Sequence, residues 1–267
     1  MDDYFVRFGM DENPFLKNSR QILVETRQFK ESQERLKKLL KTKGFGVLTG
    51  VPGNGKTTSV RVWANGLNRS MYKVVYNELS TVSLSDFYRN LAMKFGLEPR
   101  YKKTDNFKSI HEEIVRYSEK RIMPIIIIDE AMHINNDILK DMKSLFNFDM
   151  DSRDLAIVLM TGTPDLNRNL NRPMHESLKQ RLTMNYNMVG ITKEEARMFI
   201  RTKLDGVGCT REVFTPNAIE AITNASEGTP RLINKIADRS MQIADSKNVN
   251  QIDAEIVGEA VSDIELN

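Results

Sequence analysis

The chain has 267 residues, with 39 Lys and Arg against 36 Asp and Glu and a formal net charge of +3. This length fits one large domain, or a core domain with a smaller appendage, and the mild basic balance neither requires nor excludes a nucleic-acid partner. The single cysteine excludes an internal disulfide, and three scattered histidines offer no spacing for a His/Cys metal site. The apolar runs are too short for a membrane helix, so we expect a soluble cytoplasmic protein.

The first 25 residues mix aromatic and turn-forming residues, and we expect an irregular arm over 1–25 that packs on the main domain. A helix is predicted over about 27–41. Its apolar residues, among them Phe29, Leu36 and Leu39, recur on one face with lysines and glutamates opposite.

Residues 50–57, Gly-Val-Pro-Gly-Asn-Gly-Lys-Thr, match a phosphate-binding loop. A short apolar strand over 45–49 precedes them and a helix follows, which is the context this loop requires. Lys56 can reach the β- and γ-phosphates of ATP, and the Thr57 hydroxyl can ligate Mg²⁺. The residues expected to bind the nucleotide are Gly50, Pro52, Gly53, Asn54, Gly55, Lys56, Thr57 and Thr58.

A second strand is predicted over 72–76 because aromatic and β-branched residues dominate it. Ser83 then caps a helix, with Asp86 at the capping-box position. After a polar, basic loop, apolar residues at helical spacing predict a further helix over about 106–120.

The run of four isoleucines at 125–128 predicts a strand that is buried on both faces. Asp129 follows it and can lie in the second coordination shell of Mg²⁺, while Glu130 can polarise a water molecule for attack on the γ-phosphate. The alternative is an ordinary acidic pair at a strand end. A pair of this kind, downstream of a phosphate loop, favours ATP hydrolysis.

A helix over about 137–148 and an apolar strand over 155–160 continue the alternation. Strands alternating with helices predict an α/β fold, a P-loop NTPase with a doubly wound parallel sheet of about five strands.

Helices alone are predicted beyond about residue 190. Thr192 and Glu195 form a capping box, Pro216 and Pro230 suit first helical positions, and a last helix follows Gln251. We expect three parts: an N-terminal arm over 1–25, an ATPase core over 26–190 and a C-terminal helical lid over 191–267.

With the phosphate loop and acid pair in place, the chain resembles the AAA+ ATPases. Residues 160–166 lie where that family carries sensor 1, a polar residue that reads the γ-phosphate, and the resemblance implies Thr161, with Thr163 as the alternative. An ordinary turn capped by threonine would also explain them. Residues 228–234 resemble sensor 2, which implies that Arg231 contacts the nucleotide.

The same resemblance implies an arginine supplied by a neighbouring subunit. Arg181 is the first candidate, with Arg172 and Arg168 behind it. A solvated arginine on an amphipathic helix is the alternative. An intersubunit arginine would require the protein to form a homo-oligomer, a ring or a helical filament.

Several motifs are similar to the ExeA/TnsC-like ATPases, a group that includes transposon accessory ATPases: Asn13-Pro14-Phe15 and residues 43–50, 145–153 and 228–234. This implies an ATP- and Mg²⁺-dependent oligomer on double-stranded DNA that regulates a transposase or other transposition proteins. The alternative is an ExeA-like ATPase that acts on protein partners in secretion or envelope assembly. A third alternative is a small-molecule kinase or other P-loop enzyme of metabolism.

DNA binding is only weakly indicated by the residues themselves. Arg100, Lys102 and Lys103, with Tyr101 between them and Lys108 nearby, form the densest basic loop. Such a loop can contact the phosphate backbone without reading sequence, and the affinity would fall with salt. A solvated basic loop is the alternative.

Overall fold

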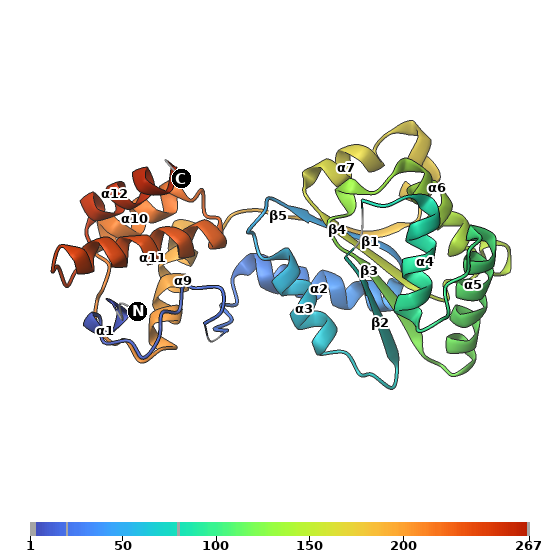
Figure 1. Ribbon diagram of the computed structural model, residues 1–267, viewed down its shortest axis with the longest axis horizontal. Helices are drawn as coiled ribbons and strands as arrows, with labels where there is room; N and C mark the ends of the chain where they lie inside the picture. The colour runs from blue at the N-terminus through green and yellow to red at the C-terminus, as the bar shows by residue number, and fades with distance from the viewer. Residues whose placement is uncertain (1–3, 20, 79–80, 266–267) are drawn as a thin grey trace. The chain divides into compact units, whose positions relative to one another are not determined.

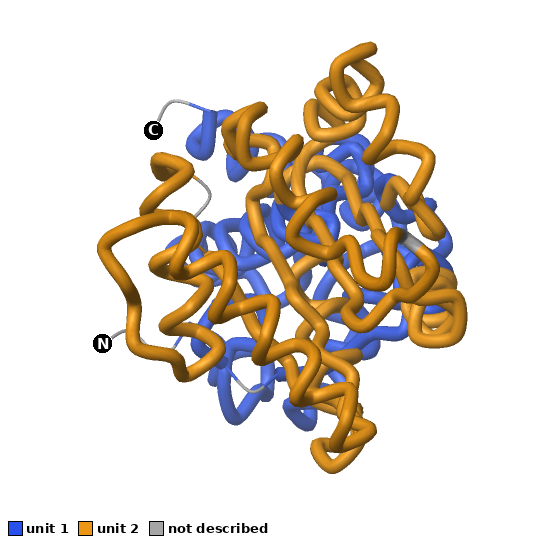
Figure 2. The backbone as a smooth tube through the Cα atoms, turned by 90° about the vertical axis from the view of Figure 1, so that its right-hand side faces the viewer, with its two compact units in different colours: residues 1–30, 53–55, 189–267 blue, residues 31–52, 56–188 orange. Residues whose placement is uncertain are grey.

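The computed structural model (Figure 1) describes residues 4–19, 21–78 and 81–265. Residues 1–3 and 20 of the expected arm and 266–267 of the expected lid lie outside these ranges. Within the ranges, every helix is too short or too polar to span a bilayer. The chain divides into two compact units (Figure 2), a first unit of 1–30, 53–55 and 189–267 and a second unit of 31–52 and 56–188.

The second unit is built on a five-stranded parallel sheet with the order β2-β3-β4-β1-β5, which confirms the predicted fold. The strands are Gly44–Gly50 (β1), Tyr72–Asn77 (β2), Met123–Ile128 (β3), Ile157–Gly162 (β4) and Leu182–Met188 (β5). The helices are Arg27–Thr42 (α2, which begins in the first unit), Lys56–Asn65 (α3), Leu84–Phe95 (α4), Lys103–Glu119 (α5), Asn136–Leu145 (α6), Pro164–Leu170 (α7) and Glu176–Lys179 (α8).

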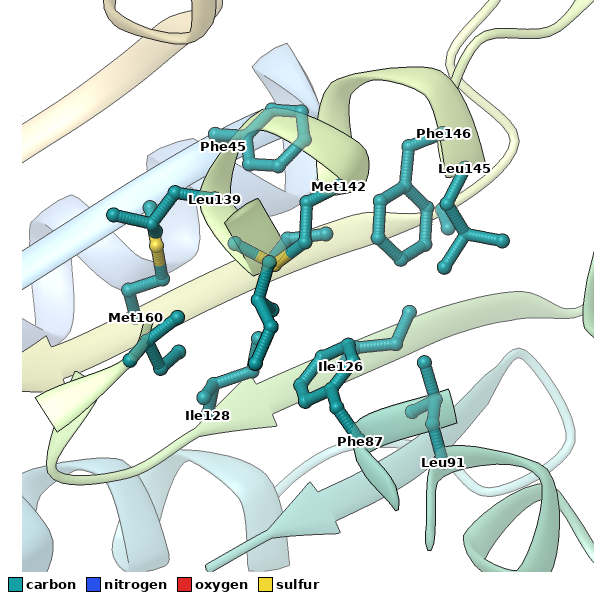
Figure 3. Packing of buried hydrophobic residues seen from close by; sticks show 14 of the residues in the cluster. Phe45, Phe87, Leu91, Ile126, Ile128, Leu139, Met142, Leu145, Phe146 and Met160 are labelled. Atoms are coloured by element: carbon teal, nitrogen blue, oxygen red, sulfur yellow. The ribbon is translucent and has the colours of Figure 1, made fainter. Parts of the chain in front are cut away.

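The sheet is covered on both faces, as the isoleucine run of β3 predicts. Successive side chains of a strand point to opposite faces. Ile125 and Ile127 therefore pack in a cluster with residues of α2 and α3, whereas Ile126 and Ile128 pack with residues of α4, α5 and α6. Figure 3 shows Ile126 and Ile128 among Phe87 of α4 and other side chains of this second cluster.

Several element boundaries differ from the sequence-based expectation. Helix α5 begins at Lys103 rather than near position 106, and strand β4 begins at Ile157 rather than at position 155. Strand β4 runs to Gly162 rather than to position 160, because its pairing with β1 continues as far as Thr49 and Gly162. Helix α6 ends at Leu145 rather than near position 148. Phe148 has φ −117° and ψ 144°, an extended backbone conformation that lies outside the helical region.

The first unit is helical in its C-terminal part. Its helices are Tyr4–Arg7 (α1), Lys193–Asp205 (α9), Pro216–Ala225 (α10), Pro230–Ser246 (α11) and Ala254–Glu265 (α12). The capping box of Thr192 and Glu195 is present, with both reciprocal hydrogen bonds, and Pro216 and Pro230 open their helices as predicted.

The N-terminal arm packs inside the first unit, so the expectation that it packs on the main domain is wrong. Phe8, Met10 and Phe15 are buried in one cluster with residues of α9 to α12. Asn13 fixes the arm to α11, because its Nδ2 donates a hydrogen bond of 2.6 Å to the Asp238 carboxylate. The arm therefore contributes apolar side chains to the core of the first unit.

A buried lysine also holds the arm. The Nζ of Lys203, on α9, donates a hydrogen bond of 2.7 Å to the Pro14 carbonyl. It lies 5.8 Å and 5.4 Å from the ring centroids of Phe15 and Phe199. Burial lowers the pKa of Lys203 to about 8, because the charged ammonium loses water that one carbonyl and two rings replace only in part.

Candidate functional site

The phosphate loop connects β1 to α3 through two residues in left-handed backbone conformations. Gly53 has a φ of 97° and Gly55 a φ of 89°. A Cβ at Gly55 would meet nothing within 4 Å, so conformation rather than space requires glycine there. These backbone turns suit a loop whose N–H groups point at bound phosphates.

Lys56 opens α3 and is buried against the loop. Its Nζ donates to the carbonyls of Gly50 at 2.7 Å and Val51 at 3.1 Å. Thr57, the next residue of α3, is exposed in the first turn of this ten-residue helix. An ammonium, a hydroxyl and a helix N-terminus fit a nucleoside triphosphate together with Mg²⁺.

The acid pair lies at the end of β3. Asp129 is 9 % exposed, and its Oδ1 accepts a hydrogen bond of 3.0 Å from the Glu130 amide. Glu130 has a φ of 50°, so the chain turns sharply after the strand, and its side chain is exposed. Asp129 is thereby fixed while Glu130 faces solvent, where a water molecule can reach it.

Of the two threonines proposed as sensor 1, only Thr161 contacts the acid pair. Thr161 is 1 % exposed on β4, and its hydroxyl donates a hydrogen bond to Asp129 Oδ1. Thr163 lies at the N-cap position of α7, where its hydroxyl donates to Asp165 Oδ2 at 3.2 Å. The adjacent strands β3 and β4 bring Asp129 and Thr161 together.

Tyr76 is a member of this site that the sequence reasoning missed. It lies on β2, and its hydroxyl donates a hydrogen bond of 2.7 Å to Asp129 Oδ2. Burial, with the Asp129 carboxylate beside it, raises the pKa of the Tyr76 phenol. The sequence shows an aromatic residue near a strand end, but the contact follows only from β2 lying next to β3.

A second polar group lies at the same edge of the sheet. The Thr49 hydroxyl, at the end of β1, donates to Asn187 Oδ1 of β5 at 3.0 Å. The same hydroxyl accepts a hydrogen bond of 2.9 Å from Asn167 Nδ2 of α7. With Tyr76, Asp129 and Thr161, these residues place a polar side chain near the carboxyl end of every strand.

Arg231 lies beside the loop residues that belong to the first unit. Its amide donates a weak hydrogen bond of 3.4 Å to the Gly53 carbonyl. A Cβ at Gly53 would lie 2.8 Å from Arg231 Cβ and 2.8 Å from Thr229 Cγ2, so these two residues leave no room for a side chain. The Arg231 side chain itself is exposed at the start of α11.

Arg181, the first candidate for the intersubunit arginine, is directed at its own chain. Its Nη1 donates to the carbonyls of Lys143 at 3.3 Å and Phe146 at 3.2 Å, at the C-terminal end of α6. A cation is favourable there because helix carbonyls carry partial negative charge. Burial lowers the pKa of the Arg181 guanidinium.

The two other candidate arginines lie between β4 and β5. Arg168 is exposed and pairs with Asp165 one turn earlier on α7. Arg172 is exposed within the run 171–174, in which all four residues are exposed. The side chain of Arg172 is therefore accessible to another molecule.

The basic loop between α4 and α5 presents its charges unequally. Lys103, the first residue of α5, is half-buried and forms an ion pair in which its Nζ lies 2.6 Å from Asp141 Oδ2. Arg100 is exposed and forms a surface ion pair of 3.7 Å with the nearby Glu98. Lys102 is exposed, and Tyr101 beside it is 91 % exposed.

The parallel sheet order, the phosphate loop after β1, the acid pair after β3 and the threonine on β4 together define an AAA+ P-loop ATPase fold. Residues 18–170 match the family model described as AAA domain. The chain belongs to this family, which implies nucleotide binding.

The chain is 28% identical over 251 residues to general secretion pathway protein A of Aeromonas hydrophila. This match covers 92% of the chain but only 45% of the Aeromonas protein, so the chain spans less than half of that relative's length.

Two archaeal structures share the fold. Cdc6p from Pyrobaculum aerophilum matches with a TM-score of 0.69 and 15% identity, over 94% of this chain and 70% of that one. The Aeropyrum pernix ORC1 protein in complex with DNA matches with a TM-score of 0.64 and 16% identity, over 94% and 69%. At these identities the likeness concerns the fold alone.

Proposed function

We propose that this protein binds ATP with Mg²⁺ at residues 50–58 and hydrolyses it. The observation that carries the proposal is the position of Asp129 and Glu130, one held by Thr161 and Tyr76 and the other open to solvent. Such a pair separates the two tasks that hydrolysis needs, holding the metal and activating water.

In this proposal each residue has a distinct task. Lys56 balances charge on the β- and γ-phosphates, and Thr57 and Asp129 would hold Mg²⁺. Mg²⁺ supplies charge neutralisation of the phosphates when bound. Glu130 accepts a proton as the water oxygen bonds to the γ-phosphorus and the bond to the bridging oxygen breaks, giving ADP and phosphate.

Two residues are proposed to sense the nucleotide. Thr161 would report the γ-phosphate to Asp129, because its hydroxyl already bonds that carboxylate. Arg231 would contact the phosphates, and its backbone position beside Gly53 supports this role.

Binding of a fluorescent ATP analogue tests the proposal. We expect Lys56→Ala to weaken binding by at least about tenfold, since the loss of one charge-assisted contact is worth about 1.5–3 kcal/mol. Lys41→Ala, a change at an exposed position of α2, is the control. Equal binding by both variants would contradict the assignment of the loop.

We further propose that an arginine of a neighbouring subunit completes the site in a homo-oligomer. Arg172→Ala should abolish hydrolysis, keep ATP binding and leave the stability of the second unit unchanged, because the side chain is exposed. Arg181→Ala, by contrast, should lower the stability of the second unit, because Arg181 donates hydrogen bonds to carbonyls at the end of α6. The fluorescence of the buried Trp63 measures this stability. Full hydrolysis by both variants would refute a role for either arginine.

Two finer functions compete. The likeness to general secretion pathway protein A favours an ATPase module acting on protein partners in secretion or envelope assembly. The other candidate is a cytoplasmic oligomer on double-stranded DNA that regulates a transposase. It is supported by the motifs at 13–15, 43–50, 145–153 and 228–234 and by a fold shared with a protein solved in complex with DNA. Regulation of a transposase is supported by these motifs and not by the similar proteins.

Hydrolysis with and without duplex DNA separates the two functions. If the protein acts on DNA, we expect faster ATP hydrolysis in the presence of DNA and large particles that form with ATP. The affinity for DNA should fall as the salt concentration rises. Arg100→Ala and Lys102→Ala should then weaken DNA binding more than Lys103→Ala, because Lys103 is paired with Asp141. A rate of ATP hydrolysis that does not change with DNA would favour an ATPase that acts on protein partners.

A further inference from the structure

The carboxylate of Asp129 is held by hydroxyl groups from both neighbouring strands. Thr161 of β4 donates to Oδ1, and Tyr76 of β2 donates to Oδ2 at 2.7 Å. The Asp129 amide also donates to the carbonyl of Asn77, the last residue of β2, at 3.0 Å, which extends the pairing of β2 with β3 one residue past the end of β3. The backbone fixes where Asp129 lies, and the two hydroxyls fix how its carboxylate is turned.

The acceptor positions of this carboxylate can be counted. An ionised carboxylate offers about four lone-pair positions, two on each oxygen. Oδ1 accepts from Thr161 and from the Glu130 amide, so both of its positions are used. Among the residues that the structure describes, Tyr76 is the donor to Oδ2, which leaves one position on Oδ2 for a further donor.

We propose that Tyr76 is a positioning residue of the metal–nucleotide site: its hydroxyl sets the direction of the open acceptor position on Asp129 Oδ2. A water molecule bound to Mg²⁺ would be received at that position. This inference rests on the proposed ATP function and deepens it.

The surroundings of Tyr76 support this role over a purely structural one. The side chain is 42 % exposed, so the ring is not a core residue whose packing alone would explain it. Tyr72, on the same face of β2, is the contrast, because its ring packs in the cluster with α2 and α3. The two tyrosines therefore allow a matched comparison.

The test measures binding of a fluorescent ATP analogue to the full chain, once in excess Mg²⁺ and once in EDTA. Tyr76→Phe is expected to reduce the gain in affinity that Mg²⁺ provides by about threefold to tenfold and to raise the Mg²⁺ concentration at half-saturation by the same factor. Binding in EDTA should stay within about twofold of wild type, and Tyr72→Phe should match wild type in both buffers.

The outcomes are distinguishable. An unchanged Mg²⁺ dependence in Tyr76→Phe would overturn the positioning role, and so would an equal loss of affinity in EDTA. Wild-type protein that binds the analogue in neither buffer would overturn the ATP function itself, and the role of Tyr76 with it. Thermal unfolding followed by Trp63 fluorescence checks that both variants retain the folded second unit.

Discussion

Lys203 binds the N-terminal arm through a buried ammonium group, and burial of this charge should lower the free energy of unfolding. Replacing Lys203 by methionine tests this expectation. Lys203 is 9 % exposed, and its Nζ donates a hydrogen bond to the Pro14 carbonyl. A pKa lowered from 10.5 to about 8 means that burial disfavours the charged form by about 3 kcal/mol. Methionine keeps most of the side-chain volume and removes the titrating group.

The sign of the pH dependence follows from proton binding. Between pH 8 and pH 10 the unfolded chain keeps the Lys203 proton while the folded chain loses it, so the free energy of unfolding rises with pH. The gain over this interval is about 2 kcal/mol. Below pH 8 both states are protonated, and the full penalty remains.

The assay must report on the first unit alone. Cys209 is the single cysteine and is buried in the core of that unit, so pulse labelling of its thiol during urea denaturation measures the unfolding of the first unit. Trp63, the single tryptophan, is buried in the second unit and reports on it separately.

We expect the difference in unfolding free energy between wild type and Lys203→Met to change by about 2 kcal/mol in favour of wild type from pH 8 to pH 10. Lys235→Met, at an exposed position of α11, should show no such change. Loss of the hydrogen bond to Pro14 changes the difference in unfolding free energy by the same amount at every pH. A difference that stays flat over this pH range would refute the reasoning.

Two further predictions concern the nucleotide site. Thr161→Val, which keeps the shape but removes the hydrogen bond to the strand-end aspartate, should lower the rate of ATP hydrolysis at least about tenfold with little effect on ATP affinity, whereas Thr163→Val should retain most activity. A parallel loss in both would argue against a sensor role. Gly53→Ala should weaken binding of a fluorescent ATP analogue more than Gly55→Ala, because only the former places a Cβ 2.8 Å from side-chain atoms. Equal affinities would contradict this geometry.

Local patterns in the sequence were sufficient for much of the fold. Four consecutive isoleucines predict a buried strand because each side chain meets a covered face, and the capping box of Thr192 and Glu195 depends only on residues three apart. The phosphate loop is equally local. These features need no knowledge of the neighbours in space.

The contacts between strands could not be predicted in the same way. Tyr76 meets Asp129 because β2 lies next to β3, and the order of strands in a sheet is not encoded in any short pattern. The placement of Arg181 against the end of α6 also depends on how separate helices pack. The expected position of the arm was wrong for the same reason, since aromatic residues in an irregular segment do not indicate which core they enter, and Phe8 and Phe15 enter that of the first unit.

Comparison of wild type with Glu130→Gln tests the central claim, ATP hydrolysis at this site, most directly. The substitution keeps the size of an exposed side chain and removes the carboxylate that would accept a proton from water. In Mg²⁺, we predict that the variant binds ATP with wild-type affinity and releases phosphate at least about a hundredfold more slowly. Phosphate release by Glu130→Gln at the wild-type rate would contradict the account.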